Sequence, residues 1–141
     1  MTGTTELSEA ERARLREIAA MIVPASEEFA MPGADDPDIF ARIVADAEAR
    51  ISETRAAMAA VDALGDLDAA AMGAALQKAA PEAAGHLQII VTQCYYRDPR
   101  VLDAIGVEAR PPFPKGYEVR QGDFSLLDPV RARGPIWREV E

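Results

Sequence analysis

The sequence predicts an all-α protein, with a small bundle of about five helices in residues 1–106 and an extended, proline- and aromatic-rich C-terminal arm in residues 107–141. Three observations favour this architecture. Capping residues precede apolar residues that recur at helical spacing. Residues 41–85 contain 18 alanines and no aromatic residue, and alanine is the best helix former. Half of the 10 prolines lie in the arm, where they disfavour regular helix and sheet.

The first two predicted helices have clear start signals. Ser8 and Glu11 form a capping-box pattern, in which a hydroxyl and a glutamate three residues later each accept a backbone N–H. Pro24 ends this helix, and residues 25–36 form a loop. Asp36 caps the second helix, because proline follows it at the first helical position. The apolar stripes are Leu15, Ile18, Ala19 and Ile22 on the first helix and Ile39, Phe40, Ile43, Val44 and Ala47 on the second.

Glycine and proline mark the next boundaries. Gly65 breaks the alanine-rich region, and Asp66 or Asp68 caps a short helix that reaches about Ala80. Pro81 opens the following helix, since the first helical position needs no N–H donor. The apolar stripe of that helix is Leu87, Ile90, Val91 and Cys94.

The last part of the chain differs in character. Asp98, followed by proline, starts the last short helix of the bundle, and Gly106 is its expected stop. The arm contains four of the eight aromatic residues and at most one short helix, after Asp128. A flexible linker would be polar, so aromatic residues here indicate anchors for a protein surface. They are Phe113, Tyr117, Phe124 and Trp137.

The charge of the chain argues against nucleic acid and membranes as partners. The net charge is −9, and residues 107–141 contain six basic and six acidic residues, so the negative excess lies in residues 1–106. Such a body repels phosphate backbones and anionic lipid headgroups. No segment reaches the ~18 apolar residues of a membrane span. Met1–Glu11 has no signal-peptide pattern, so we expect a cytoplasmic protein, periplasmic only if an exported partner carries it.

The sequence offers few residues for chemistry. With one cysteine, Cys94, and one histidine, His86, it excludes an internal disulfide and a two-histidine metal site. Phosphate-binding glycine motifs and the G-x-S-x-G elbow are absent. Cys94 lies on an apolar stripe, which indicates a small buried side chain rather than a nucleophile. The acidic pairs at 27–28 and 35–36 match no calcium loop, so we expect no metal or other cofactor in this chain.

Two interpretations of His86 stay open. As a general base it would act beside Tyr95 and Tyr96, which would make the chain a small enzyme. As a helix-edge residue it would be partly exposed, with Glu82 one turn away as a surface partner. The second interpretation is favoured, because no matched set of catalytic partners accompanies the histidine.

Three short motifs carry a resemblance to a known family. They are Ile22-Val23-Pro24 after the first helix, Pro32-Gly33-Ala34 before the second, and Tyr95-Tyr96 with Pro99, Val101, Gly106 and Pro114-Lys115-Gly116-Tyr117. In order and spacing they resemble the small subunit, subunit 3, of gluconate 2-dehydrogenase. The resemblance covers about residues 15–117, and residues 52–80 match only in being helical.

That resemblance implies a non-catalytic accessory subunit. Members of the family accompany a large flavin-dependent dehydrogenase of the glucose–methanol–choline type, often with a multi-haem cytochrome c as a third subunit. They support the folding, stability or export of the large subunit, which holds the FAD. Many members carry a twin-arginine signal, from which this sequence departs.

We therefore expect the chain to bind a large flavoprotein through aromatic, apolar and arginine side chains, the residue types that anchor interfaces. Two alternatives stay open: a free-standing acidic helical adaptor or regulator, and the small enzyme considered above. The expected partner-binding residues are Tyr95, Tyr96, Pro112, Phe113, Tyr117, Phe124, Leu127, Arg131 and Trp137.

Overall fold

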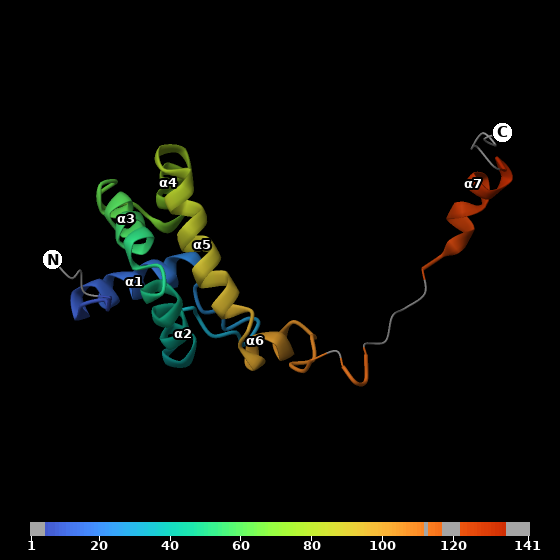
Figure 1. The fold of residues 1–141 in the computed structure, drawn as a ribbon, viewed down its shortest axis with the longest axis horizontal. Coiled ribbons are helices and arrows are strands. Elements are labelled where there is room, and N and C mark those ends of the chain that lie inside the picture. The colour runs from blue at the N-terminus through green and yellow to red at the C-terminus, as the bar shows by residue number, and fades with distance from the viewer. Residues whose placement is uncertain (1–4, 112, 117–121, 135–141) are drawn as a thin grey trace, which may run out of the picture. The chain divides into compact units, whose positions relative to one another are not determined.

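The chain is all-α, as the sequence predicts (Figure 1). A computed structural model describes residues 5–111, 113–116 and 122–134. Within these residues there are seven α-helices, one 3-10 turn and no β-strand, apart from an isolated bridge between Ser26 and Met31. The helices are α1 (Glu9–Ile22), α2 (Pro37–Glu48), α3 (Ile51–Asp62), α4 (Ala69–Ala79), α5 (Pro81–Tyr95), α6 (Pro99–Ala104) and α7 (Asp128–Ala132), and the 3-10 turn is η1 (Phe124–Leu127).

The chain divides into two compact units, Met1–Ala109 and Arg110–Glu141. The first contains α1 to α6 and the second contains η1 and α7. The sequence predicts this boundary between residues 106 and 107. It also predicts at most one short helix in the arm, after Asp128. Helical structure instead begins at Phe124, where Asp123 caps the 3-10 turn by accepting the N–H of Ser125.

Helix α5 organises the first unit, because it packs against α1, α2, α3 and α4 (Figure 1). Its buried side chains are Leu87, Ile90, Val91, Cys94 and Tyr95, which include the whole predicted stripe. Removing such apolar surface from water is the main driving force for folding. The other helices contribute mainly aliphatic residues to the same core: Leu15 and Ile18 from α1, Ile39 and Ile43 from α2, Val61 from α3, Leu76 from α4 and Val101 from α6.

The predicted helix starts are confirmed. Ser8 and Glu11 form a complete capping box. Asp36, Asp68 and Asp98 each accept backbone N–H groups at the starts of α2, α4 and α6. Gly106 follows α6 with a φ of 76°, a conformation that glycine adopts without steric cost.

One helix boundary was missed, so the first unit has six helices rather than about five. Between α2 and α3 the backbone leaves the helical region at Arg50, which has φ −130° and ψ 46°. The Thr54 hydroxyl holds this corner, since it donates to the carbonyl oxygens of Ala47 and Arg50 at 3.1 and 3.0 Å. The break lets both helices pack against α5.

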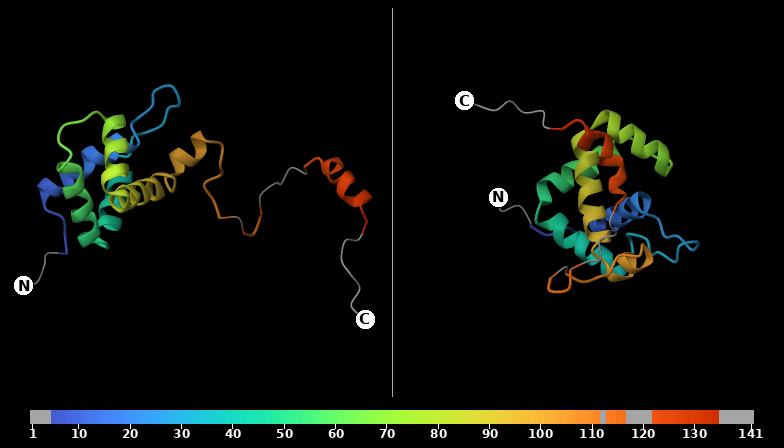
Figure 2. Two further views of the ribbon diagram at one scale, coloured as in Figure 1. Left: turned by 90° about the horizontal axis from the view of Figure 1, so that it is seen from above. Right: turned by 90° about the vertical axis from the view of Figure 1, so that its right-hand side faces the viewer.

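The loop between α1 and α2 projects from the bundle next to α6 (Figure 2). Its two ends are tied together, because Ala34 donates its N–H to the carbonyl oxygen of Val23 at 2.9 Å. Within the loop, Ser26 and Met31 exchange two backbone hydrogen bonds and close a short hairpin. The loop is therefore an ordered element built on the bundle.

Candidate functional site

Exposed apolar side chains gather in residues 122–134, which we call the C-terminal segment. Leu126 is 77% exposed, and Phe124, Leu127 and Val130 are each exposed by 45% or more. All four lie within residues 124–130, which form η1 and the first turn of α7. Such a run of large apolar residues in water is typical of a protein-binding segment.

Other residues expected to bind a partner lie on or near the C-terminal segment. Arg131 is exposed and pairs only weakly with Asp128, one turn away at 3.4 Å. Among the described residues, Phe113 is the most exposed large apolar side chain, at 85%. Phe113, Phe124, Leu127 and Arg131 are therefore all accessible to a partner. Pro112, Tyr117 and Trp137 lie outside the described residues.

The two adjacent tyrosines differ, and one assignment was wrong. Tyr96 is 52% exposed, as a partner-binding residue requires. Tyr95 is only 2% exposed, so it is a core residue that a partner cannot contact. Its ring packs edge-to-face against that of Tyr96, with 5.3 Å between the ring centroids. The sequence held a signal for this difference, because Tyr95 lies four residues after the buried Val91 and continues its stripe.

Tyr95 also joins two of the three sequence motifs on which the family resemblance rests. Its hydroxyl donates to the carbonyl oxygen of Pro32 at 2.9 Å. The Val23–Ala34 hydrogen bond joins the remaining motif to the same corner. Gly33 is buried there, and a Cβ atom at its position would lie 3.0 Å from the backbone nitrogen of Ala25. Parts of all three motifs thus build one corner of the bundle.

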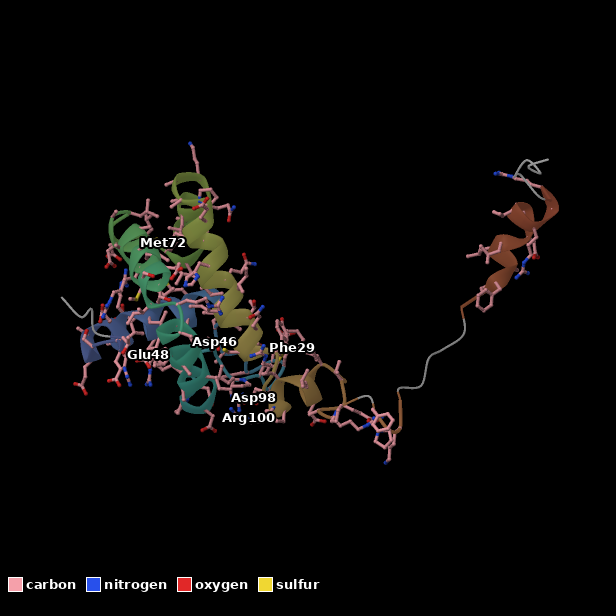
Figure 3. All side chains as sticks on the ribbon, viewed as in Figure 1. Phe29, Asp46, Glu48, Met72, Asp98 and Arg100 are labelled. Carbon is pink, nitrogen blue, oxygen red and sulfur yellow. The ribbon has the colours of Figure 1, made fainter. Side chains whose placement is uncertain are left out.

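An ionic cluster is built around Asp98 and Arg100, which are labelled in Figure 3. The carboxylate of Asp98 is buried and accepts hydrogen bonds from Arg100 at 2.9 Å and from Arg42 at 3.2 Å. Arg100 also binds Asp36 at 2.7 Å. Hydrogen bonding to Arg100 lowers the pKa of both Asp36 and Asp98. The cluster joins the starts of α2 and α6, a tertiary contact that the cap motifs alone did not reveal.

His86 does not share a site with the tyrosines. It lies near the start of α5, nine residues from Tyr95, a rise of about 14 Å along a helix. Its Nε2 atom is 2.9 Å from the Oγ1 atom of Thr54, rather than beside Glu82. The same hydroxyl lies within hydrogen-bond distance of the carbonyl oxygens at the α2–α3 corner, so His86 contacts that corner. Burial lowers the pKa of His86, and Arg50 lowers it further. The acid–base site of the small-enzyme hypothesis is therefore not assembled.

Cys94 is buried, as predicted. Its thiol lies 3.7 Å from an oxygen of Asp46. Burial raises the pKa of this thiol to about 11, and the nearby Asp46 carboxylate contributes to the same shift. The thiol is therefore protonated at neutral pH, which makes it a poor nucleophile.

A feature that the sequence did not reveal is an apolar groove of about 550 Å³ between α1, α4 and α5. Met72, labelled in Figure 3, lines it from α4, together with Ile22 from α1 and Leu87 from α5. Tyr96 and Pro24 lie at the same groove, so it reaches the motif corner. Residues on α1, α3, α4 and α5 line the groove, and only the tertiary packing brings them together.

The comparisons with known proteins add no further identification. No protein-family model, curated protein or solved structure matches the chain. None of the described helices is long and apolar enough to cross a membrane. The described residues also contain no group of three or more histidine, cysteine or acidic side chains placed to hold a metal ion.

Proposed function

We propose that this chain is a non-catalytic small subunit of a flavin-dependent oxidoreductase complex, and that it stabilises or matures a large catalytic subunit of the glucose–methanol–choline type. The observation that supports this most is the exposed apolar surface of the C-terminal segment. When another surface covers Phe124, Leu126 and Leu127, the free energy falls by about 25 cal/mol for each Å² of apolar surface that is buried. A binding role follows from this surface more directly than a catalytic one.

The resemblance supplies the class of partner in this proposal. Its motifs converge on one corner through the Val23–Ala34 and Tyr95–Pro32 hydrogen bonds. The motif residues therefore have a structural role in the fold. Such a role is expected of a subunit whose partner carries the cofactor. The FAD and any cytochrome c belong to other chains in this proposal, in the cytoplasm or wherever the partner resides.

A free-standing acidic adaptor is the second candidate, and the charge of the first unit favours it. Residues 1–109 contain 19 acidic and nine basic residues. Such a surface attracts basic partners of many kinds. The adaptor and the flavoprotein subunit would both bind through the C-terminal segment and would differ only in the identity of the partner. One experiment therefore separates these two candidates.

The proposal is tested by expressing the large flavoprotein subunit in three ways: alone, with the full chain, and with a chain ending at Ala109. The full chain should give the highest yield of soluble, flavin-loaded large subunit. The shortened chain, checked by circular dichroism for its helices, should give less, because it lacks the C-terminal segment. Equal flavin-loaded yields in all three cultures would contradict the proposal.

A further inference from the structure

The hairpin between α1 and α2 holds one large apolar side chain in water. Ser26 donates its N–H to the Met31 carbonyl oxygen at 3.0 Å, and Met31 returns the bond at 2.9 Å. Phe29 lies at the tip, where its side chain is 65% exposed. Figure 3 shows it near the C-terminal end of α5 in that view. We call residues 26–31 the Phe29 hairpin.

The backbone of this hairpin is fixed in an uncommon conformation. Ala30 has φ 50°, in the left-handed region, which L-residues other than asparagine and aspartate rarely adopt. It is the only non-glycine residue with positive φ in the described part of the chain. Its N–H donates to the Glu27 carbonyl oxygen at 3.2 Å, which closes the tip. Strained backbone of this kind persists where the surroundings hold it, and it concentrates at binding sites.

The neck below the hairpin is also rigid. The Val23–Ala34 hydrogen bond closes it, and the buried Tyr95 hydroxyl holds the carbonyl oxygen of Pro32. These hydrogen bonds fix the backbone that carries Phe29. A backbone that is already ordered loses less conformational entropy on binding, which raises affinity.

Acidic residues lie on both sides of Phe29 in the sequence. Glu27 and Glu28 precede Phe29 at the tip, and Asp35 follows at the neck; all three residues are exposed. No ion pair to a lysine or arginine is formed by any of the three within the described residues. A partner surface with lysine or arginine side chains would complement the charge of these carboxylates.

From these observations we infer that the Phe29 hairpin is a second recognition element: Phe29 enters an apolar pocket of a partner protein, and lysine or arginine side chains on the rim of that pocket pair with Glu27 and Glu28. The occupant is a different protein with a basic surface rather than a second copy of this chain, because two acidic hairpins repel each other. The inference deepens the proposed function, since it names the chemistry of the partner surface.

Photo-crosslinking in the native host tests this inference. The photoreactive residue p-benzoyl-phenylalanine replaces Phe29 in one variant and Ile89, an exposed side chain on α5, in the matched control. We expect position 29 to crosslink to another protein more efficiently than position 89. The attached peptide should combine apolar residues with lysine or arginine.

The identity of the crosslinked protein separates this inference from the proposed function. A flavoprotein supports both, whereas a different basic protein supports the inference and overturns the proposed function. A crosslink between two copies of the chain, or no crosslink at position 29, overturns the inference.

Binding of the captured partner gives a second, quantitative test. Phe29→Ala should weaken it about thirtyfold with the melting temperature unchanged, because the side chain contacts solvent in the free chain. Ala30→Gly should keep both the hairpin and full affinity, since glycine adopts positive φ freely. Glu27→Gln with Glu28→Gln should weaken binding at low salt and reduce its salt dependence. Unchanged affinity of Phe29→Ala contradicts the inference.

Discussion

The hydroxyl of Tyr95 and the carbonyl oxygen of Pro32 lie 2.9 Å apart, although 63 positions separate the two residues in the sequence. This hydrogen bond ties the end of α5 to the neck of the Phe29 hairpin. It also gives the hydroxyl of the buried Tyr95 a partner, whereas Tyr96 faces solvent. The tyrosine pair therefore divides into one residue that builds the fold and one that is available to a partner.

Replacing Tyr95 with phenylalanine should destabilise the fold. The substitution keeps the ring and removes the hydroxyl, so the Pro32 carbonyl oxygen loses its donor. We expect the free energy of unfolding to fall by about 1 kcal/mol, measured by urea denaturation. Tyr96→Phe is the matched control and should change it by less than about 0.5 kcal/mol. Equal effects of the two substitutions would show that the hydrogen bond contributes nothing.

His86 should make stability depend on pH. Burial lowers its pKa in the folded chain below the ordinary 6.5. The unfolded chain then binds the proton more readily, so stability is full above pH 6.5 and is lost as the pH falls through the folded pKa. His86→Gln should remove this slope. As the sole histidine, it gives one imidazole NMR titration, whose midpoint should lie below 6.5; a midpoint at or above 6.5 would contradict this.

Cys94 should resist thiol reagents in the folded chain. Its side chain is buried and its pKa is raised to about 11, so little thiolate exists at pH 8. Ellman's reagent should react slowly without denaturant and rapidly in guanidinium, with one thiol released per chain. Rapid reaction of the native chain would show that the α2–α5 contact opens readily.

The C-terminal segment should be needed for binding and not for stability. Phe124→Ser combined with Leu127→Ser should weaken the complex at least tenfold, because apolar anchors dominate interface energy. The melting temperature of the free chain should not change, since both side chains are exposed. Leu67→Ser, an exposed apolar residue in the first unit, is the control. A lower melting temperature with unchanged affinity would assign these residues to the chain's own fold.

Local signals made much of the fold predictable. A cap uses one side chain and the backbone just after it, so Ser8, Asp36 and Asp98 could be identified from a few residues each. The break at Arg50 could not, because no glycine or proline marks it. That corner depends on Thr54 and on packing against α5, which are tertiary contacts.

The candidate sites were harder to predict for the same reason. Phe124 and Leu127 stood out because apolar residues are unusual in a proline-rich segment. Phe29 did not, since one aromatic residue in a loop carries little information without the hairpin around it. The burial of Asp98 and the groove at Met72 arise only when separate helices meet.

Purification of the tagged chain from its native host, at its native level, tests the central proposal most directly. The chain should retain a large protein, and the complex should show the visible absorbance of an oxidised flavin. After the subunits are separated, the flavin should remain with the large protein and the small chain should be colourless. A chain that elutes alone, or with a partner that holds no flavin, would contradict the proposed function.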